Sequence, residues 1–146
     1  MKKRTLINSM QINTISRNSN QDFIRSAVKE FVKQIDLTIT EMSDISTAVG
    51  EAIQNIVDFA YDNIGKIQVE VLIYEGNHIK IKIRDWGCGI DNVKQAMEPL
   101  YTTMDGDKAG LGFSVMESFM DSVKVYSNVG RGTTIVMQKT CCSKEF

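Results

Sequence analysis

The sequence predicts a two-layer α/β sandwich of the α+β type, in which a mainly antiparallel, mixed sheet carries helices on one face. Two observations support this fold class. Apolar and polar residues alternate on both sides of a short turn at Glu75-Gly76-Asn77, which is typical of a β-hairpin. Two stretches with helical spacing of apolar residues precede the hairpin, and a further helix followed by two strands comes after it.

The first part of the chain is expected to contain a strand and two helices. Loosely alternating apolar residues predict an edge strand over residues 6–15, and the polar residues 18–20 offer N-cap oxygens to a helix. The expected apolar stripe of this helix is Phe23, Ala27, Phe31 and Ile35. A second helix is expected over about residues 40–62. Its apolar stripe is Ile45, Val49, Ala52, Ile53, Ile56 and Ala60.

The second part is expected to hold the hairpin, two helices and two closing strands. The alternating apolar residues of the hairpin are Ile67, Val69, Val71 and Ile73, then Ile79, Ile81 and Ile83. A short helix is expected over residues 92–97, a polar loop over 98–109, and a longer helix over 111–120. Strands near residues 123–127 and 133–139 complete the sheet.

Composition narrows the class of function. The chain has 146 residues, of which 42% are hydrophobic, and this suits one domain, placed at 1–140, with a polar tail at 141–146. Its 17 basic and 18 acidic residues nearly balance, which argues against a general nucleic-acid binder. Its three cysteines indicate neither a disulfide framework nor a zinc site. No apolar run approaches the ~20 residues of a membrane span, so we expect a cytoplasmic protein.

A polar stripe on the second expected helix is the first candidate site. It consists of Glu51, Asn55, Asp58 and Asp62, whose spacing of four, three and four residues places them on one narrow face. An amide oxygen such as that of Asn55 is a good neutral ligand for Mg²⁺. A carboxylate one turn away, here Glu51, can orient or deprotonate an attacking hydroxyl. A solvated helix face would show the same pattern, so both interpretations stay open.

The second candidate lies at the end of the second hairpin strand. Asp85 continues the alternation of the buried isoleucines, and a buried carboxylate costs several kcal/mol unless it is hydrogen-bonded. It is therefore either a structural acceptor or the residue that binds a polar ligand, such as the amino group of a base. Gly87 and Gly89 would let the backbone turn tightly against that ligand, although a plain turn is the alternative.

The third candidate is the glycine-rich start of the last helix, Gly110-Leu111-Gly112. Unpaired N–H groups at a helix N-terminus suit a phosphate, and Thr102, Thr103 and Lys108 in the preceding loop could add donors. A glycine-rich helix start without any phosphate is also common. The chain contains neither a P-loop nor a complete dinucleotide-binding fingerprint.

Together the three candidates resemble the N, G1 and G2 boxes of the Bergerat ATP-binding fold, which gyrase, histidine kinases and MutL share as the GHKL superfamily. The motifs are Glu51-x-x-x-Asn55, Asp85-x-Gly87-x-Gly89 and Gly110-x-Gly112. Within that superfamily, the chain resembles the anti-sigma factor/serine kinase branch, above all the sporulation anti-sigma-F factors. The stretches that carry this likeness are residues 50–55, 98–103, 110–121 and 132–135.

The resemblance implies a role for each motif residue. Asn55 would ligate Mg²⁺, and Glu51 would be the catalytic base for the serine hydroxyl of a partner. Asp85 would bind the adenine amino group of ATP in a pocket that Gly87 and Gly89 shape. Donors around the last helix would hold the phosphates under a lid at about residues 102–109. The remaining expected nucleotide-binding residues are Ile90, Thr102, Thr103, Lys108, Gly110, Leu111, Gly112 and Thr134.

The resemblance also implies partners. Proteins of this branch form homodimers, sequester a sigma factor and phosphorylate a small anti-anti-sigma protein of the STAS type on serine, without binding nucleic acid directly. Arg25 matches an arginine used in partner contact, and a solvated helix charge is the alternative. The chain departs from the branch at Ile56 and Phe59, where a small residue and a histidine are common. The alternative function is a non-catalytic, ATP-dependent protein-binding switch of the same fold.

Overall fold

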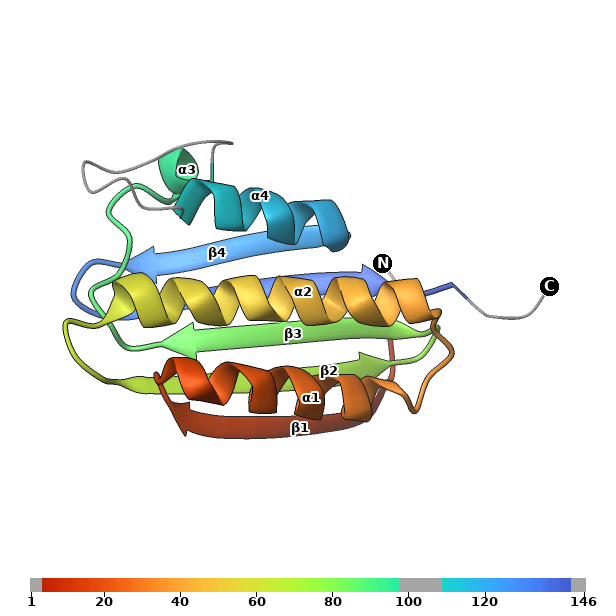
Figure 1. Ribbon diagram of the computed structural model, residues 1–146. Coiled ribbons are helices and arrows are strands. Elements are labelled where there is room, and N and C mark those ends of the chain that lie inside the picture. The colour runs from red at the N-terminus through yellow and green to blue at the C-terminus, as the bar shows by residue number, and fades with distance from the viewer. Residues whose placement is uncertain (1–3, 98–108, 143–146) are drawn as a thin grey trace.

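The computed structural model of the chain describes residues 4–97 and 109–142. In this part a five-stranded sheet of order β1-β2-β3-β5-β4 forms one layer, and the longer helices cover one of its faces (Figure 1). The fold class is therefore as predicted. All neighbouring strands of the described sheet are antiparallel, so the expected mixed character is wrong. The reason is that β4, the strand that runs parallel to β3, lies beyond β5 at the sheet edge.

The strands lie where alternation places them. They are β1 (Leu6–Ile15), β2 (Lys66–Tyr74), β3 (His78–Asp85), β4 (Ser122–Asn128) and β5 (Gly132–Thr140). The turn between β2 and β3 passes through Gly76 (φ 80°) and Asn77 (φ 56°). Two consecutive left-handed residues are what a tight hairpin turn requires, because their twist matches that of the flanking strands.

The first helix confirms the expected element but not its buried face. A 3-10 turn (Asn18–Asn20) leads into α1 (Gln21–Val32). Its buried residues are Ile24, Val28 and Val32, whereas Phe23 is 58% exposed. The expected buried stripe is one residue out of phase with the observed one. The expected and the observed residues both recur at helical spacing, so spacing alone does not decide which set is buried.

The second helix, α2 (Ile39–Asn55), starts with a capping box. The Thr38 hydroxyl accepts a hydrogen bond from the N–H of Glu41, and the Glu41 carboxylate accepts one from the N–H of Thr38. The expected apolar stripe is buried along its whole length. A π-helical segment, η2 (Ile56–Ala60), continues α2 and ends before Asp62, so the expected polar stripe does not extend that far.

The chain then passes through α3 (Val93–Ala96) to α4 (Ala109–Phe119), which packs against α2. Core packing continues past residue 140, the expected end of the domain. Cys141 is 5% exposed and belongs to the hydrophobic core, and burial raises the pKa of its thiol to about 12. Among the described residues, no helix is both long and apolar enough to cross a membrane.

Candidate functional site

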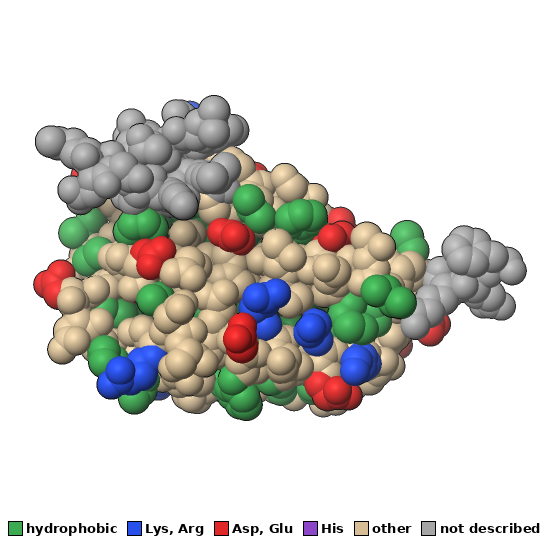
Figure 2. Space-filling model, viewed as in Figure 1, with side chains coloured by type: hydrophobic (Ala, Val, Ile, Leu, Met, Phe, Trp, Pro, Cys, Tyr) green, Lys and Arg blue, Asp and Glu red, His purple; other side chains and the backbone are tan. Residues whose placement is uncertain are grey.

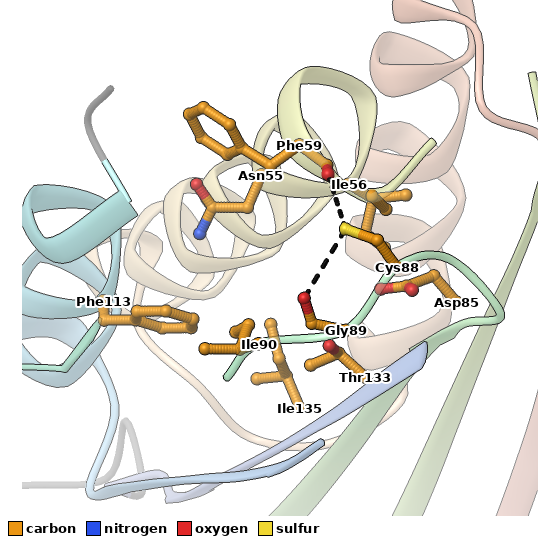
Figure 3. Close-up of a pocket in the computed structure, with 11 residues that line it drawn as sticks. Asn55, Ile56, Phe59, Asp85, Cys88, Gly89, Ile90, Phe113, Thr133 and Ile135 are labelled. Carbon is orange, nitrogen blue, oxygen red and sulfur yellow. Dashed lines mark hydrogen bonds between the residues drawn. The ribbon is translucent and has the colours of Figure 1, made fainter. Parts of the chain in front are cut away.

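A cavity of about 70 Å³ lies between α2, η2, the loop after β3, the start of α4, and β5 (Figure 3). We call it the apolar cavity, because most of its lining is hydrophobic: Ile56, Phe59, Ala60, Ile90, Phe113 and Ile135. The other side chains on its wall are Asn55, Asp85, Cys88 and Thr133. Such a hollow suits a flat apolar ring that also offers a few polar atoms.

Asp85 is the buried carboxyl group of this cavity. It is 5% exposed and lies opposite Thr133 of β5 in the sheet register. Its Oδ1 accepts a hydrogen bond from the N–H of Gly87 at 2.9 Å. Burial raises the pKa of the Asp85 carboxyl, while hydrogen bonds from the backbone of Gly87 and Thr133 act in the opposite direction. A partly desolvated carboxylate of this kind favours a ligand that donates a hydrogen bond.

The loop after β3 lies close against two other segments, and its glycines make that approach possible. A Cβ at Gly87 would collide with the carbonyl oxygen of Ala60, and one at Gly89 would collide with that of Asn128. Gly89 also has a left-handed φ of 79°. The N–H of Cys88 donates to Ala60 O at 2.8 Å, which ties the loop to η2.

Tyr61, which the sequence reasoning missed, holds the same loop from outside the cavity. Its hydroxyl accepts a hydrogen bond from the N–H of Trp86 at 2.8 Å and donates one to the carbonyl of Lys66 at 2.7 Å. Two cations lie over the Trp86 ring: the Lys66 ammonium at 4.9 Å and the Arg84 guanidinium at 4.5 Å from its centre. No motif marks Tyr61, since an aromatic residue after a helix is common.

The cysteine of the loop is also fixed by its neighbours. The Cys88 thiol contacts the carbonyl oxygens of Phe59 at 3.2 Å and Gly89 at 3.5 Å, as the dashed lines in Figure 3 show. Cys88 and Phe59 therefore contribute to one side of the cavity. Neither was among the expected site residues.

The side chain of Asn55 lies at the contact between α2 and α4. Among the described residues, its buried Nδ2 has no hydrogen-bond partner. A Cβ on Gly112 would lie 3.1 Å from both Nδ2 and Oδ1 of Asn55, so the amide faces the glycine-rich start of α4. A buried amide with an unused donor fits a polar ligand at this place.

The other expected nucleotide-binding residues divide into four groups. Ile90 lines the apolar cavity, and Gly110 and Leu111 belong to the first turn of α4. Thr134 is absent from the described lining, and its neighbour Thr133 lines the cavity instead, because adjacent strand residues point to opposite faces. The geometry therefore favours Thr133 over Thr134. The remaining residues lie outside the described part of the chain: Thr102, Thr103 and Lys108.

Glu51 and Arg25 lie together in a second hollow of about 140 Å³ between α1 and α2, which we call the polar groove. Its lining consists of Gln21, Arg25, Thr47, Gly50, Glu51 and Gln54. Glu51 faces this groove, whereas Asn55, one helical turn later, faces the apolar cavity. Figure 2 shows basic and acidic side chains intermixed over the helix-covered face.

The described residues do not build a metal site of their own. They contain no group of three or more His, Cys, Asp or Glu side chains able to hold a metal ion. Mg²⁺ is commonly bound by one or two protein oxygens together with substrate phosphates, and the Asn55 amide oxygen fits that part.

Comparisons with known proteins give the class. A family profile described as a histidine kinase-like ATPase domain matches residues 17–139. Solved structures agree at the level of the fold. The RsbU and RsbW domains of a Mycobacterium tuberculosis protein superpose with a TM-score of 0.66 at 16% identity, covering 91% of this chain and 32% of that one. A mycobacterial sensor histidine kinase gives 0.57 at 17% identity, covering 89% and 97%. The chain belongs to the histidine kinase-like ATPase family, which implies ATP binding.

Closer relatives define the branch. An anti-sigma F factor of Clostridium beijerinckii is 46% identical over 135 residues, which cover 90% of this chain and 94% of the relative. That of Clostridium acetobutylicum is 40% identical over 135 residues, covering 92% and 94%. Within the ATPase family, the chain belongs to the anti-sigma F factors.

Proposed function

We propose that the chain binds ATP with Mg²⁺ in the apolar cavity, sequesters a sigma factor, and phosphorylates an anti-anti-sigma protein on serine. One observation carries this proposal. α2 presents Asn55 to the apolar cavity and Glu51, one turn earlier, to the polar groove. A single rigid helix thus links a nucleotide-binding residue to a carboxylate on the side where a protein partner can approach.

The cavity accounts for nucleotide binding. Asp85 accepts a hydrogen bond from the adenine amino group, and the apolar side chains around it cover the ring. The N-terminal turn of α4 donates hydrogen bonds from its backbone N–H groups to the phosphates. Mg²⁺ is held by Asn55 and by phosphate oxygens, and when bound it neutralises charge on the triphosphate.

The polar groove accounts for transfer to a partner. Glu51 accepts the proton of the serine hydroxyl, and the serine oxygen forms a bond to the γ-phosphorus while the bond from that phosphorus to the β–γ bridging oxygen breaks. ADP is the leaving group. Catalysis of this type depends mainly on positioning, so the fixed spacing of Glu51 and Asn55 on one helix is the protein's contribution.

Partner contact is proposed on the same face. Arg25 lines the polar groove with Glu51, so a protein bound to Arg25 brings its side chains close to the catalytic carboxylate. Thr102, Thr103 and Lys108 are proposed to add phosphate donors. A homodimer in the cytoplasm that acts in sporulation completes the proposal, and this part is supported by similarity to anti-sigma F factors.

Phosphate transfer tests the proposal. The purified chain is incubated with γ-labelled ATP, Mg²⁺ and the anti-anti-sigma protein of the same bacterium. Glu51→Ala should abolish the serine label but retain ATP binding, whereas Glu117→Ala, which removes an exposed carboxylate on α4, should label the partner like wild type. An unchanged rate in Glu51→Ala would remove Glu51 from its role. ATP binding by wild type without any labelling would favour the non-catalytic switch.

A further inference from the structure

Arg25 is held against α2 by a buried serine. Its Nε donates a hydrogen bond to Oγ of Ser46 at 3.1 Å, and Ser46 is only 3% exposed. A short polar side chain inside a helix often bonds to its own backbone, which weakens the helix. Here the Ser46 hydroxyl instead accepts a hydrogen bond from Arg25 of the neighbouring helix α1.

Gly50 makes room for the same side chain. A Cβ built on Gly50 would lie 3.2 Å from Cδ and 3.5 Å from Nε of Arg25. Glycine in a helix interior is destabilising relative to alanine, and Gly50 lies within α2. The stem of Arg25 therefore lies against α2 at Gly50, where a larger residue would crowd it.

These two contacts determine what the arginine can do. Nε donates to Ser46, and the stem lies against Gly50. Among residues 4–97 and 109–142, the terminal amino groups of the guanidinium have no hydrogen-bond partner, so they can bind a ligand in the polar groove, where Glu51 also lies. A guanidinium matches a carboxylate in a forked, planar geometry that requires a fixed orientation. An arginine that is already ordered loses less side-chain entropy when it binds.

We propose that Ser46 and Gly50 are positioning residues, which hold Arg25 ready to bind a carboxylate of the protein partner. The inference rests on the proposed function, because it takes Arg25 as a partner contact. Neither residue belongs to a nucleotide-binding motif, and neither lines the apolar cavity. Substitution at either position should therefore change partner affinity without changing ATP affinity.

A measurement without any partner tests the tether itself. The Nε–H signal of Arg25 is assigned in ¹⁵N-labelled protein by its loss in Arg25→Lys. Its exchange with water should be slow in wild type and in Ser43→Ala, which removes an exposed hydroxyl from the same helix. It should become fast in Ser46→Ala, because the acceptor is gone. Equal exchange in wild type and Ser46→Ala would overturn the inference.

Binding of the sigma-F-type factor of the same bacterium gives the functional test. Ser46→Ala should raise the dissociation constant about three- to tenfold, the range for one hydrogen bond. Gly50→Ala should also weaken binding of the sigma factor. The melting temperature of this variant should not fall, because alanine favours a helix more than glycine does. In an Arg25→Ala background, Ser46→Ala should add no further loss. ATP affinity should equal that of wild type in both single variants.

The outcomes separate the two proposals. If Arg25→Ala weakens binding but Ser46→Ala and Ser43→Ala bind alike, the positioning role is overturned and the proposed function stands. The positioning role is likewise overturned, and the proposed function stands, if the losses of binding free energy from Ser46→Ala and Arg25→Ala add in the double variant. If wild type binds no sigma factor, the proposed function fails, and the partner role of Ser46 and Gly50 fails with it.

Discussion

The side-chain amide of Asn55 lies directly against Gly112, with only 3.1 Å between its two polar atoms and the place where a Cβ of Gly112 would be. The contact joins α2 to the first turns of α4 beside the apolar cavity. This contact requires glycine at position 112, because the side chain of any larger residue would crowd the Asn55 amide. Two motifs far apart in the sequence thus form one wall of the candidate site.

Gly112→Ala should weaken ATP binding without lowering the stability of the fold. The new Cβ displaces the Asn55 amide, and loss of one hydrogen bond or ligand contact to a charged group should weaken ATP binding about tenfold or more. The melting temperature without nucleotide should not fall, because alanine is favoured over glycine in a helix by about 1 kcal/mol. Fluorescence of Trp86, the sole tryptophan of the chain, reports ATP binding. Ser118→Ala on α4 is the control, and equal ATP affinity in Gly112→Ala would contradict the account.

Asp85→Asn should lose ATP binding and change the pH dependence of stability. Burial raises the pKa of Asp85 above its ordinary value of 3.8. The ionised form is therefore disfavoured by folding, so wild type loses stability relative to the variant as pH rises from that value through the folded pKa. An asparagine can still accept the hydrogen bond from Gly87. Thermal unfolding should show the variant at least as stable as wild type at pH 8, with a smaller difference at pH 3.5.

The matched control for Asp85 is Asp91→Asn, which removes an exposed carboxyl from the same loop. It should bind ATP like wild type. A variant at Asp85 that is less stable than wild type at every pH would show that the carboxylate is mainly a structural acceptor.

Tyr61→Phe should loosen the loop after β3. It removes the acceptor for the N–H of Trp86 and the donor to Lys66, so the free energy of unfolding should fall by about 1–3 kcal/mol. Chemical denaturation followed by Trp86 fluorescence measures this loss, and ATP affinity should fall with it. Tyr126→Phe, at a residue that is 58% exposed, should change neither quantity. Equal stability of the two variants would refute the role given to Tyr61.

Glu41→Gln should weaken the start of α2 and its connection to the end of β5. Besides the capping box, the Glu41 carboxylate accepts a hydrogen bond from the N–H of Cys142 at 2.8 Å. Burial raises the pKa of Glu41, but hydrogen bonds from Thr38 and Cys142 outweigh it and leave that pKa below its ordinary 4.5. The carboxylate therefore stabilises the fold above that pH, and the gain is lost as pH falls through the folded pKa.

Urea unfolding at pH 7 should show a loss of about 0.5–2 kcal/mol in Glu41→Gln, because a cap and a charge near the positive helix end are both weakened. The loss should shrink at pH 3. Glu30→Gln, whose ion pair with Lys33 is exposed, should have little effect at either pH. A loss in Glu41→Gln that does not depend on pH would contradict the charge argument.

Much of the site could be predicted because it depends on strand alternation. The parity of the isoleucines in β3 places Asp85 on the buried face, and the structure confirms this burial. The hairpin turn at residues 75–77 is equally local, since glycine and asparagine accept the left-handed backbone that it needs.

What could not be predicted depends on phase and on contacts between distant segments. The change to a π-helix after Asn55 leaves no mark in apolar spacing, so Asp62 was expected on the helix. The buried side of α1 is set by its packing on the sheet and α2, which decides for Ile24 over Phe23. The separation of Glu51 from the apolar cavity likewise follows from the position of α1, which forms the other side of the polar groove.

The central claim is that the apolar cavity between α2 and α4 is the ATP site. Amide chemical shifts of ¹⁵N-labelled protein, followed during titration with ATP and Mg²⁺, test it most directly. The account predicts that the largest changes are at Gly87, Gly89, Ile90 and Gly112, with saturation at one nucleotide per chain. Chemical-shift changes confined to strand residues whose side chains lie on the sheet face without helices, or no saturable change at all, would contradict this claim.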